Sequence, residues 1–142
     1  FRRAFADFDF NRVAGFGARD VNRLLADASI VRHRGKIEAT INNARRAVEL
    51  TEAEGSLARY VWRYEPDPRS RPRRLTWKAL TEMAETPESR ALAKDLKARG
   101  WRFVGPTTVY AFMQAMGLVN DHLEGCPARP HVERAIRKPP AR

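Results

Sequence analysis

The chain has 142 residues and a formal charge of +10, from 27 Lys and Arg against 17 Asp and Glu. This length fits one domain, and 43% hydrophobic residues can form a core, which excludes a compositionally disordered protein. A single cysteine, Cys126, excludes an internal disulfide and with it a disulfide-stapled secreted scaffold. Because no apolar stretch approaches the roughly 20 residues that span a bilayer, we expect a cytoplasmic protein without membrane association.

The basic excess consists mostly of arginine, since five of the 27 cations are lysines. A guanidinium matches the geometry of phosphate oxygens, so the charge favours a nucleic-acid partner. A proteome rich in arginine would give the same charge without such a partner. At the start of the chain, Phe1, Phe5 and Phe8 have helical spacing, and Phe1 takes the place of an initiating Met. We therefore expect a helix over residues 1–8 that continues from a preceding segment.

Three further helices are expected in the first half of the chain. The first covers residues 20–27, the longest covers residues 36–53, and a short one begins after Ser56 and must end before Pro66. Their apolar positions at helical spacing are Val21, Leu24, Leu25, Ile37, Ile41, Ala44, Val48, Leu57, Tyr60, Val61 and Tyr64.

Residues 65–74 hold three prolines and four arginines and therefore form a loop. We favour a solvated connection there over a loop that touches phosphates. Two helices follow, one from the Thr86 cap with Pro87 to Gly100, and one from Pro106 to Gly117. The second is expected to bury Val109, Phe112, Met113 and Met116.

No strand pattern and no repeat stands out, so the predicted fold class is all-α. We expect one helical domain over residues 1–126, with a helix-hairpin-helix at residues 87–117. Prolines at 127, 130, 139 and 140 predict a poorly ordered tail over residues 127–142.

The six residues between the last two helices carry the most informative pattern. Gly100 is placed to end the first helix, Phe103 or Val104 to pack between the helices, and Gly105 to allow close approach of the backbone. The helix that begins at Pro106 leaves unpaired N–H groups, which favour a phosphate. An ordinary turn also uses Gly and Pro in this way, but the basic charge favours DNA gripped by its backbone. The expected DNA contacts are Gly100, Arg102, Gly105, Thr107 and Thr108.

His122 and Cys126 are four residues apart, a spacing that suits two of the four ligands of a tetrahedral zinc. Two ligands are not a site, so the spacing alone favours a buried thiol and a histidine bonded to the backbone. His33, His131 or a carboxylate are the remaining ligands that the chain could supply. Asp121 stands beyond the second helix, where we expect it to cap the following turn rather than to act in catalysis.

Three segments together resemble bacterial DNA-3-methyladenine glycosylase I, a family of helix-hairpin-helix DNA glycosylases. They are IVRHRGKI at residues 30–37, GWRFVGPTT at 100–108 and FMQAMGLVNDH at 112–122, and the resemblance extends from Phe1 to about Cys126. It implies base excision repair of alkylated double-stranded DNA by hydrolysis of the N-glycosidic bond of 3-methyladenine. It also implies a structural zinc with His122 and Cys126 as one ligand pair.

In that family the other two zinc ligands, and the glutamate and aromatic residues of the base pocket, precede the position of Phe1. The resemblance therefore implies that this chain is the C-terminal part of such an enzyme, that it acts as a monomer, and that it carries no catalytic residue itself. The alternative is a non-catalytic helix-hairpin-helix module, or an inactive remnant, that binds DNA without chemistry.

Overall fold

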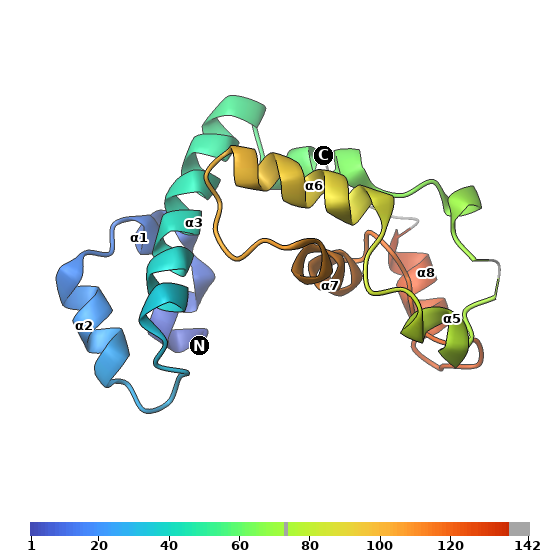
Figure 1. Cartoon of the computed structure of the whole chain (residues 1–142), viewed down its shortest axis with the longest axis horizontal. Helices are drawn as coiled ribbons and strands as arrows, with labels where there is room; N and C mark the ends of the chain where they lie inside the picture. Colours follow the sequence, from blue (N-terminus) through green and yellow to red (C-terminus); the bar gives the residue numbers. More distant parts are fainter. Residues whose placement is uncertain (73, 137–142) are drawn as a thin grey trace. The chain divides into compact units, whose positions relative to one another are not determined.

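The computed structural model describes residues 1–72 and 74–136, and all regular structure within them is helical (Figure 1). The predicted all-α fold class is confirmed. The chain forms two compact units: unit 1 contains Phe1–Leu57 and Leu96–Phe103, and unit 2 contains Ala58–Asp95 and Val104–Arg142. The sequence analysis treated residues 1–126 as one domain, whereas the chain passes repeatedly between these two units. Within the described residues, no helix has the length and apolar character needed to cross a bilayer.

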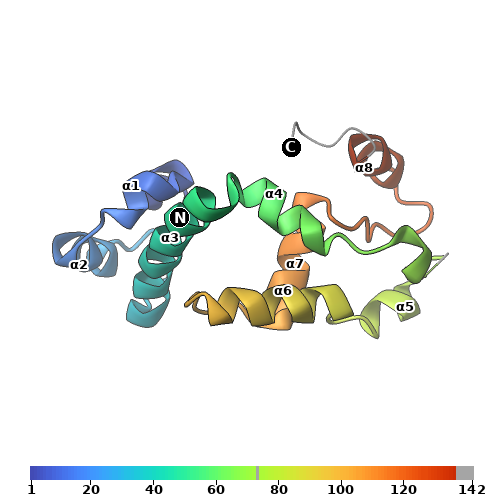
Figure 2. The same ribbon diagram turned by 90° about the horizontal axis from the view of Figure 1, so that it is seen from above.

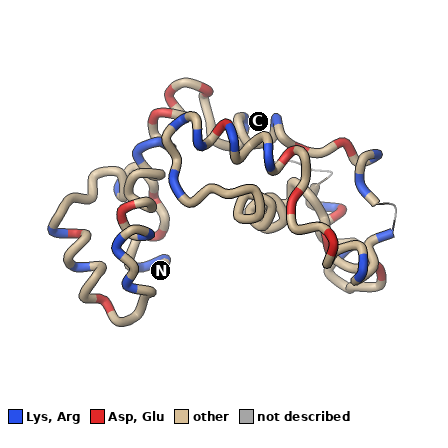
Figure 3. The backbone as a smooth tube through the Cα atoms, viewed as in Figure 1, with Lys and Arg blue, Asp and Glu red and all other residues tan. Residues whose placement is uncertain are grey.

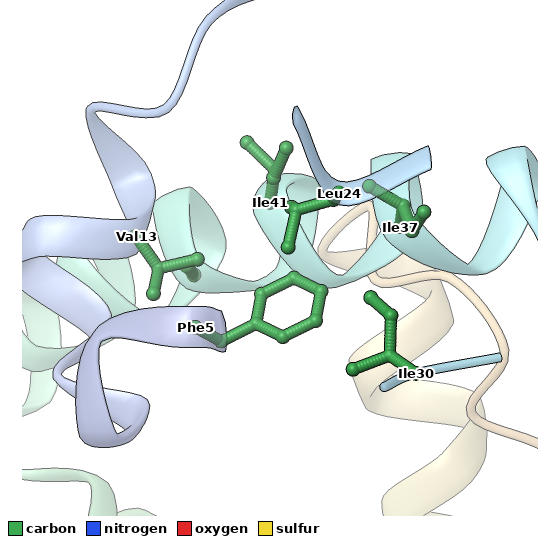
Figure 4. Close-up of a cluster of buried hydrophobic side chains, with 7 residues drawn as sticks. Phe5, Val13, Leu24, Ile30, Ile37 and Ile41 are labelled. Atoms are coloured by element: carbon green, nitrogen blue, oxygen red, sulfur yellow. The ribbon is translucent and has the colours of Figure 1, made fainter. Parts of the chain in front are cut away.

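Unit 1 is built around one long helix. Helices α1 (Phe10–Ala14) and α2 (Ala18–Ala26) pack against α3 (Arg34–Glu54), preceded by the 3-10 segment η1 (Arg3–Phe8). Figure 4 shows the core that they enclose, which confirms Ile37, Ile41 and Ala44 of the predicted inward stripe, whereas Val48 is half-buried. The buried side chains are Phe5, Val13, Leu24, Ile30, Ile37, Ile41 and Ala44.

The predicted regular helix over residues 1–8 was wrong. Ala6, Asp7 and Phe8 have positive φ angles of 51°, 57° and 62°, which break the helical path. This reversal leaves Asp9 as the cap of α1, where its carboxylate accepts the N–H groups of the first turn. Phe5 is therefore buried, while Phe8 remains 56% exposed.

Short elements lie between α3 and α6 in the chain. They are α4 (Leu57–Val61), η2 (Trp62–Tyr64), η3 (Pro68–Ser70) and α5 (Trp77–Thr81), the last of which the sequence did not predict. Helix α6 (Pro87–Ala98) begins in unit 2, at the predicted cap, where the Thr86 hydroxyl accepts the N–H of Ser89 at 3.1 Å. Helix α7 (Pro106–Met116) crosses α6 steeply (Figure 2).

The apolar face of α7 differs from the prediction. Val109, Tyr110 and Met113 are buried, but Phe112 is 41% and Met116 51% exposed. After the left-handed turn at Gly117, the N–H of Leu118 bonds to the carbonyl of Met113 at 3.0 Å, and Leu118 and Val119 are buried. The buried residues of unit 2 include Tyr60, Leu75, Leu92, Ala93, Val109, Tyr110, Met113, Leu118 and Val119.

The predicted disordered tail is in part a helix. Residues 129–136 form α8 (Arg129–Ile136), with Arg129 paired to Glu133 at 3.1 Å across one turn. Pro130 lies in the first turn of α8, where a missing N–H costs nothing, so the proline does not prevent the helix. The last prolines of the predicted tail lie outside the described residues.

Candidate functional site

The loop after α6 begins with a left-handed residue, as the sequence predicted. Gly100 has a φ of 80°, its N–H bonds to the carbonyl of Lys97, and the N–H of Trp101 bonds to that of Leu96, both at 3.0 Å. These bonds satisfy carbonyl groups that the end of a helix would leave unpaired. The loop therefore leaves α6 in one defined direction within unit 1.

Two asparagines of α3 hold this loop. Asn42 donates its side-chain amide to the carbonyl of Gly100 at 2.9 Å. Asn43 bonds to both backbone groups of Arg102: it donates to the carbonyl and accepts from the N–H, each at 2.9 Å. The Arg102 backbone is therefore fixed, while its side chain remains exposed. We call these three bonds the asparagine clamp.

Phe103 or Val104 was expected to pack between the helices. Phe103 does not, because its φ of 56° turns the side chain outward, whereas Val104 is half-buried. The ring is 60% exposed and meets the His33 ring edge-on, with 6.5 Å between centroids. A left-handed backbone costs a residue other than glycine about 1–3 kcal/mol and persists only where surrounding contacts enforce it. The asparagine clamp on Arg102, the preceding residue, provides such contacts.

The start of α7 belongs to unit 2. Gly105 caps the helix without a side chain, so the N–H groups of Thr107 and Thr108 receive no side-chain acceptor from it. A Cβ atom added at Gly105 would meet nothing within 4 Å. The expected DNA contacts thus fall in two places, with Gly100 and Arg102 in unit 1 and Gly105, Thr107 and Thr108 in unit 2.

His122 and Cys126 lie side by side after α7. The His122 Nδ1 and Cys126 Sγ atoms are 3.6 Å apart. A tetrahedral zinc with bonds of about 2.1 Å to nitrogen and 2.3 Å to sulfur would separate the two ligand atoms by about 3.6 Å. The pair therefore fits one edge of a zinc tetrahedron.

Within the described part of the chain, no cluster of three or more His, Cys, Asp or Glu side chains could hold a metal. The two other histidines are otherwise engaged: His33 Nδ1 accepts the N–H of Lys36 at 3.2 Å, and His131 lies 2.7 Å from the Arg134 guanidinium.

Asp121 does not cap a turn, so that prediction was wrong. Its carboxylate is 7% exposed and pairs with the guanidinium of Arg71, which is 15% exposed. It also accepts the Tyr110 hydroxyl at 2.5 Å and the Gln114 amide at 2.8 Å. The residue that caps locally is Asn120, whose side-chain oxygen accepts the N–H of His122 at 3.3 Å.

These contacts shift the pKa values of Tyr110 and Arg71, two of the partners of Asp121. Burial raises the pKa of Tyr110 above its ordinary value, and the hydrogen bond to Asp121 raises it further. Burial lowers the pKa of Arg71, but its bonds to Tyr110 and Asp121 outweigh that effect and the net pKa is raised. At neutral pH the Arg71 guanidinium is therefore charged and the Tyr110 phenol is neutral, and both donate to Asp121.

Comparison with known proteins decides the family. Residues 1–129 match the model of the methyladenine glycosylase family. The chain belongs to the methyladenine glycosylase family. DNA-3-methyladenine glycosylase 1 of Escherichia coli (strain K12) is 43% identical over 127 residues, which cover 89% of this chain and 66% of that protein. The corresponding enzyme of Haemophilus influenzae is 36% identical and is matched over 69% of its length, with 91% of this chain covered.

Solved structures of this family resemble the chain in fold and sequence. A crystal structure of 3-methyladenine DNA glycosylase I is 45% identical and superposes with a TM-score of 0.78, covering 91% of this chain and 70% of that one. The Staphylococcus aureus enzyme, described for its recognition of 3-methyladenine, is 36% identical with a TM-score of 0.79, over 91% of this chain and 68% of that one. The chain thus spans about two thirds of the length of these relatives.

Two parts of the site were not predicted from the sequence. Asn42 and Asn43 stand mid-helix, where a short amide side chain disfavours the helix, and that disadvantage was the one local sign of another role. Arg71 was counted among the solvated arginines of its loop, and nothing local distinguishes it from Arg69 or Arg74.

Proposed function

We propose that the protein to which these residues belong releases 3-methyladenine from alkylated DNA by hydrolysing the N-glycosidic bond. Membership in the methyladenine glycosylase family carries this proposal, together with the activity of relatives that are 36–45% identical. The methylated base is cationic, so it leaves without prior protonation. The enzyme must instead extrude the nucleotide and bind the cationic ring, while the duplex is held in place.

The residues described here contribute the grip on the DNA backbone. At the start of α7, a helix N-terminus with a glycine cap offers unpaired N–H groups to a phosphate oxygen. In unit 1, the clamped loop carries the exposed guanidinium of Arg102. Backbone contacts of this kind fix the register of a duplex and carry no sequence information, which suits an enzyme that searches all sequences for a damaged base.

Asp121 supports the fold rather than the chemistry. A carboxylate that is 7% exposed and already accepts three donors has little capacity to stabilise a reacting sugar. The carboxylate and the aromatic rings that read the base belong, by the family resemblance, to residues outside these 142.

A structural zinc is held in part by His122 Nδ1 and Cys126 Sγ. The 3.6 Å between these atoms supports the assignment, because tetrahedral coordination asks for that separation. The zinc, when bound, supplies a cross-link between this pair and two further ligands. The chain orients the pair locally: the Arg129 guanidinium donates to the carbonyl of His122 at 2.6 Å, and the N–H of Cys126 bonds to the carbonyl of Leu123 at 3.0 Å.

The test is release of 3-methyladenine from methylated duplex DNA, followed by chromatography of the free base. We compare the 142 residues alone with a chimera in which the unaligned residues of the Escherichia coli enzyme are joined to them in their native order. The chimera should release the base, and the 142 residues alone should bind duplex DNA with little or no release. A chimera that binds DNA and leaves 3-methyladenine in place would refute the proposed substrate. Equal release by both would locate the base-reading residues in this chain.

A further inference from the structure

The Phe103 ring is kept at the surface of unit 1 by contacts that oppose its burial. It is 60% exposed, and its left-handed backbone, with a φ of 56°, would suit glycine better than phenylalanine. The asparagine clamp fixes the residue before it. An exposed aromatic ring at a strained and clamped backbone position indicates a surface that contacts a ligand.

The surroundings of this ring are cationic. The segment that meets Phe103 carries Arg32, Arg34 and Lys36, and Arg102 precedes the ring in the chain. Figure 3 shows this basic character near the start of α3. Arg34 is paired with Glu38 at 3.4 Å, whereas Arg32, Lys36 and Arg102 have no carboxylate within 4 Å among the described residues. We call Arg32, His33, Arg34, Lys36, Arg102 and Phe103 the Phe103 patch.

A glycine and a histidine shape the support of the ring. A Cβ atom at Gly35 would come within 3.2 Å of the His33 ring and 4.0 Å of the Phe103 ring, so a side chain there would disturb the pair. His33 Nδ1 accepts the N–H of Lys36, which holds the imidazole over the start of α3. The two rings meet at an interplanar angle of 81°, and Phe103 remains 60% exposed beside the imidazole.

We propose that the Phe103 patch contacts DNA, with the phenyl ring stacked on an apolar face of a nucleotide and the cations around it on phosphates. Such a combination of ring and cations matches the alternation of apolar faces and anionic groups along a nucleic-acid strand. An acidic peptide would satisfy the cations but would leave the ring without a regular partner. This inference rests on the proposed function, and it adds Phe103 and the residues 32–36 to the DNA-binding surface.

Phe103→Gly tests the ring without endangering the fold. Glycine adopts a φ of 56° without strain, so thermal unfolding should show stability equal to or above that of the parent. The matched control is Phe8→Gly, because Phe8 lies in the same unit, is 56% exposed and has a φ of 62°, but stands between Asp7 and Asp9. Arg102→Ala serves as the variant that removes a phosphate contact.

Binding is measured by fluorescence anisotropy with a labelled duplex of about 20 base pairs over a series of salt concentrations. Loss of one stacking contact should weaken binding by Phe103→Gly about 5- to 100-fold at every salt concentration. The slope of log K against log salt should stay unchanged in that variant and should fall by about 0.9 in Arg102→Ala. Phe8→Gly should bind as the parent does.

Equal binding by Phe103→Gly and Phe8→Gly would overturn the inference and leave the proposed function intact, since the parent would still bind. Failure of the parent to bind the duplex would overturn both. A single strand and a strand of abasic units distinguish two sources of the apolar face. Loss of affinity for both strands assigns the contact to deoxyribose, and loss for the base-bearing strand alone assigns it to a base. Unchanged affinity for both of these strands and for the duplex refutes the contact.

Discussion

Replacing Asp121 with alanine removes the acceptor that three side chains share in unit 2. The Arg71 guanidinium would remain 85% buried without its carboxylate, and Tyr110 and Gln114 would lose their bonds. Removal of one partner from a buried ion pair costs about 3–5 kcal/mol, because the other charge stays desolvated. For a chain of this size, 1 kcal/mol corresponds to roughly 4 °C in Tm, so we expect a fall of about 10–20 °C.

Glu124→Ala is the matched control, since it breaks the pair of Glu124 with Arg74, whose side chains are 56% and 76% exposed. An exposed pair contributes about 0–1 kcal/mol, so this variant should unfold within a few degrees of the parent, by circular dichroism. The double variant Arg71→Met with Asp121→Asn removes both charges, keeps an acceptor for Tyr110, and should recover at least about half of the loss. Equal unfolding temperatures for Asp121→Ala and Glu124→Ala would refute this reasoning, because burial would then not determine how much an ion pair contributes to the stability of the fold.

Two more outcomes are expected. In the proposed zinc site, His122 and Cys126 supply two of four ligands, so the 142 residues alone should lose zinc readily to a chelator; a stoichiometric zinc that resists chelation would mean that other residues complete the site. Burial raises the pKa values of Tyr60 and Tyr110 above their ordinary 10.0, and hydrogen bonds to Asp95 and Asp121, respectively, raise them further. The two phenols therefore ionise at lower pH in the unfolded state than in the folded state, and the free energy of unfolding should fall as pH rises past about 10. Urea titrations at pH values of about 9 and 11 should show a smaller fall for Tyr110→Phe, and an identical fall would contradict the assignment.

Local patterns predicted the helices well because short-range chemistry sets their ends. The Thr86 cap, the left-handed residue Gly100 and the start at Pro106 all act through neighbours within four residues. The buried apolar positions of α3 were equally predictable from the sequence, since Ile37, Ile41 and Ala44 follow the helical period.

The failures came from contacts between distant segments. Asn43 and Arg102 are 59 residues apart in the chain, and Arg71 and Asp121 are 50 apart, so no local pattern joins them. On α7, Phe112 and Met116 were expected to be buried, but the buried residues are Val109, Tyr110 and Met113, together with Leu118 and Val119 beyond the Gly117 turn. Of Phe103 and Val104, the two alternatives for a side chain between the helices, Phe103 is exposed because of its left-handed backbone, which its apolar character does not reveal.

The most direct test of the grip on DNA compares Gly105→Asp with Gly17→Asp in duplex binding at low salt. Both glycines cap a helix, and at both a Cβ atom would meet nothing within 4 Å, so both variants should fold. Each variant adds one negative charge. At Gly17, however, the backbone N–H already bonds to the Asp20 carboxylate in the first turn of α2, which disfavours a further anion there. We predict that Gly105→Asp weakens binding at least about tenfold, because its carboxylate takes the N–H groups meant for phosphate and repels DNA, while Gly17→Asp binds as the parent does. Equal binding by Gly105→Asp and Gly17→Asp would contradict the assignment of this helix start to DNA.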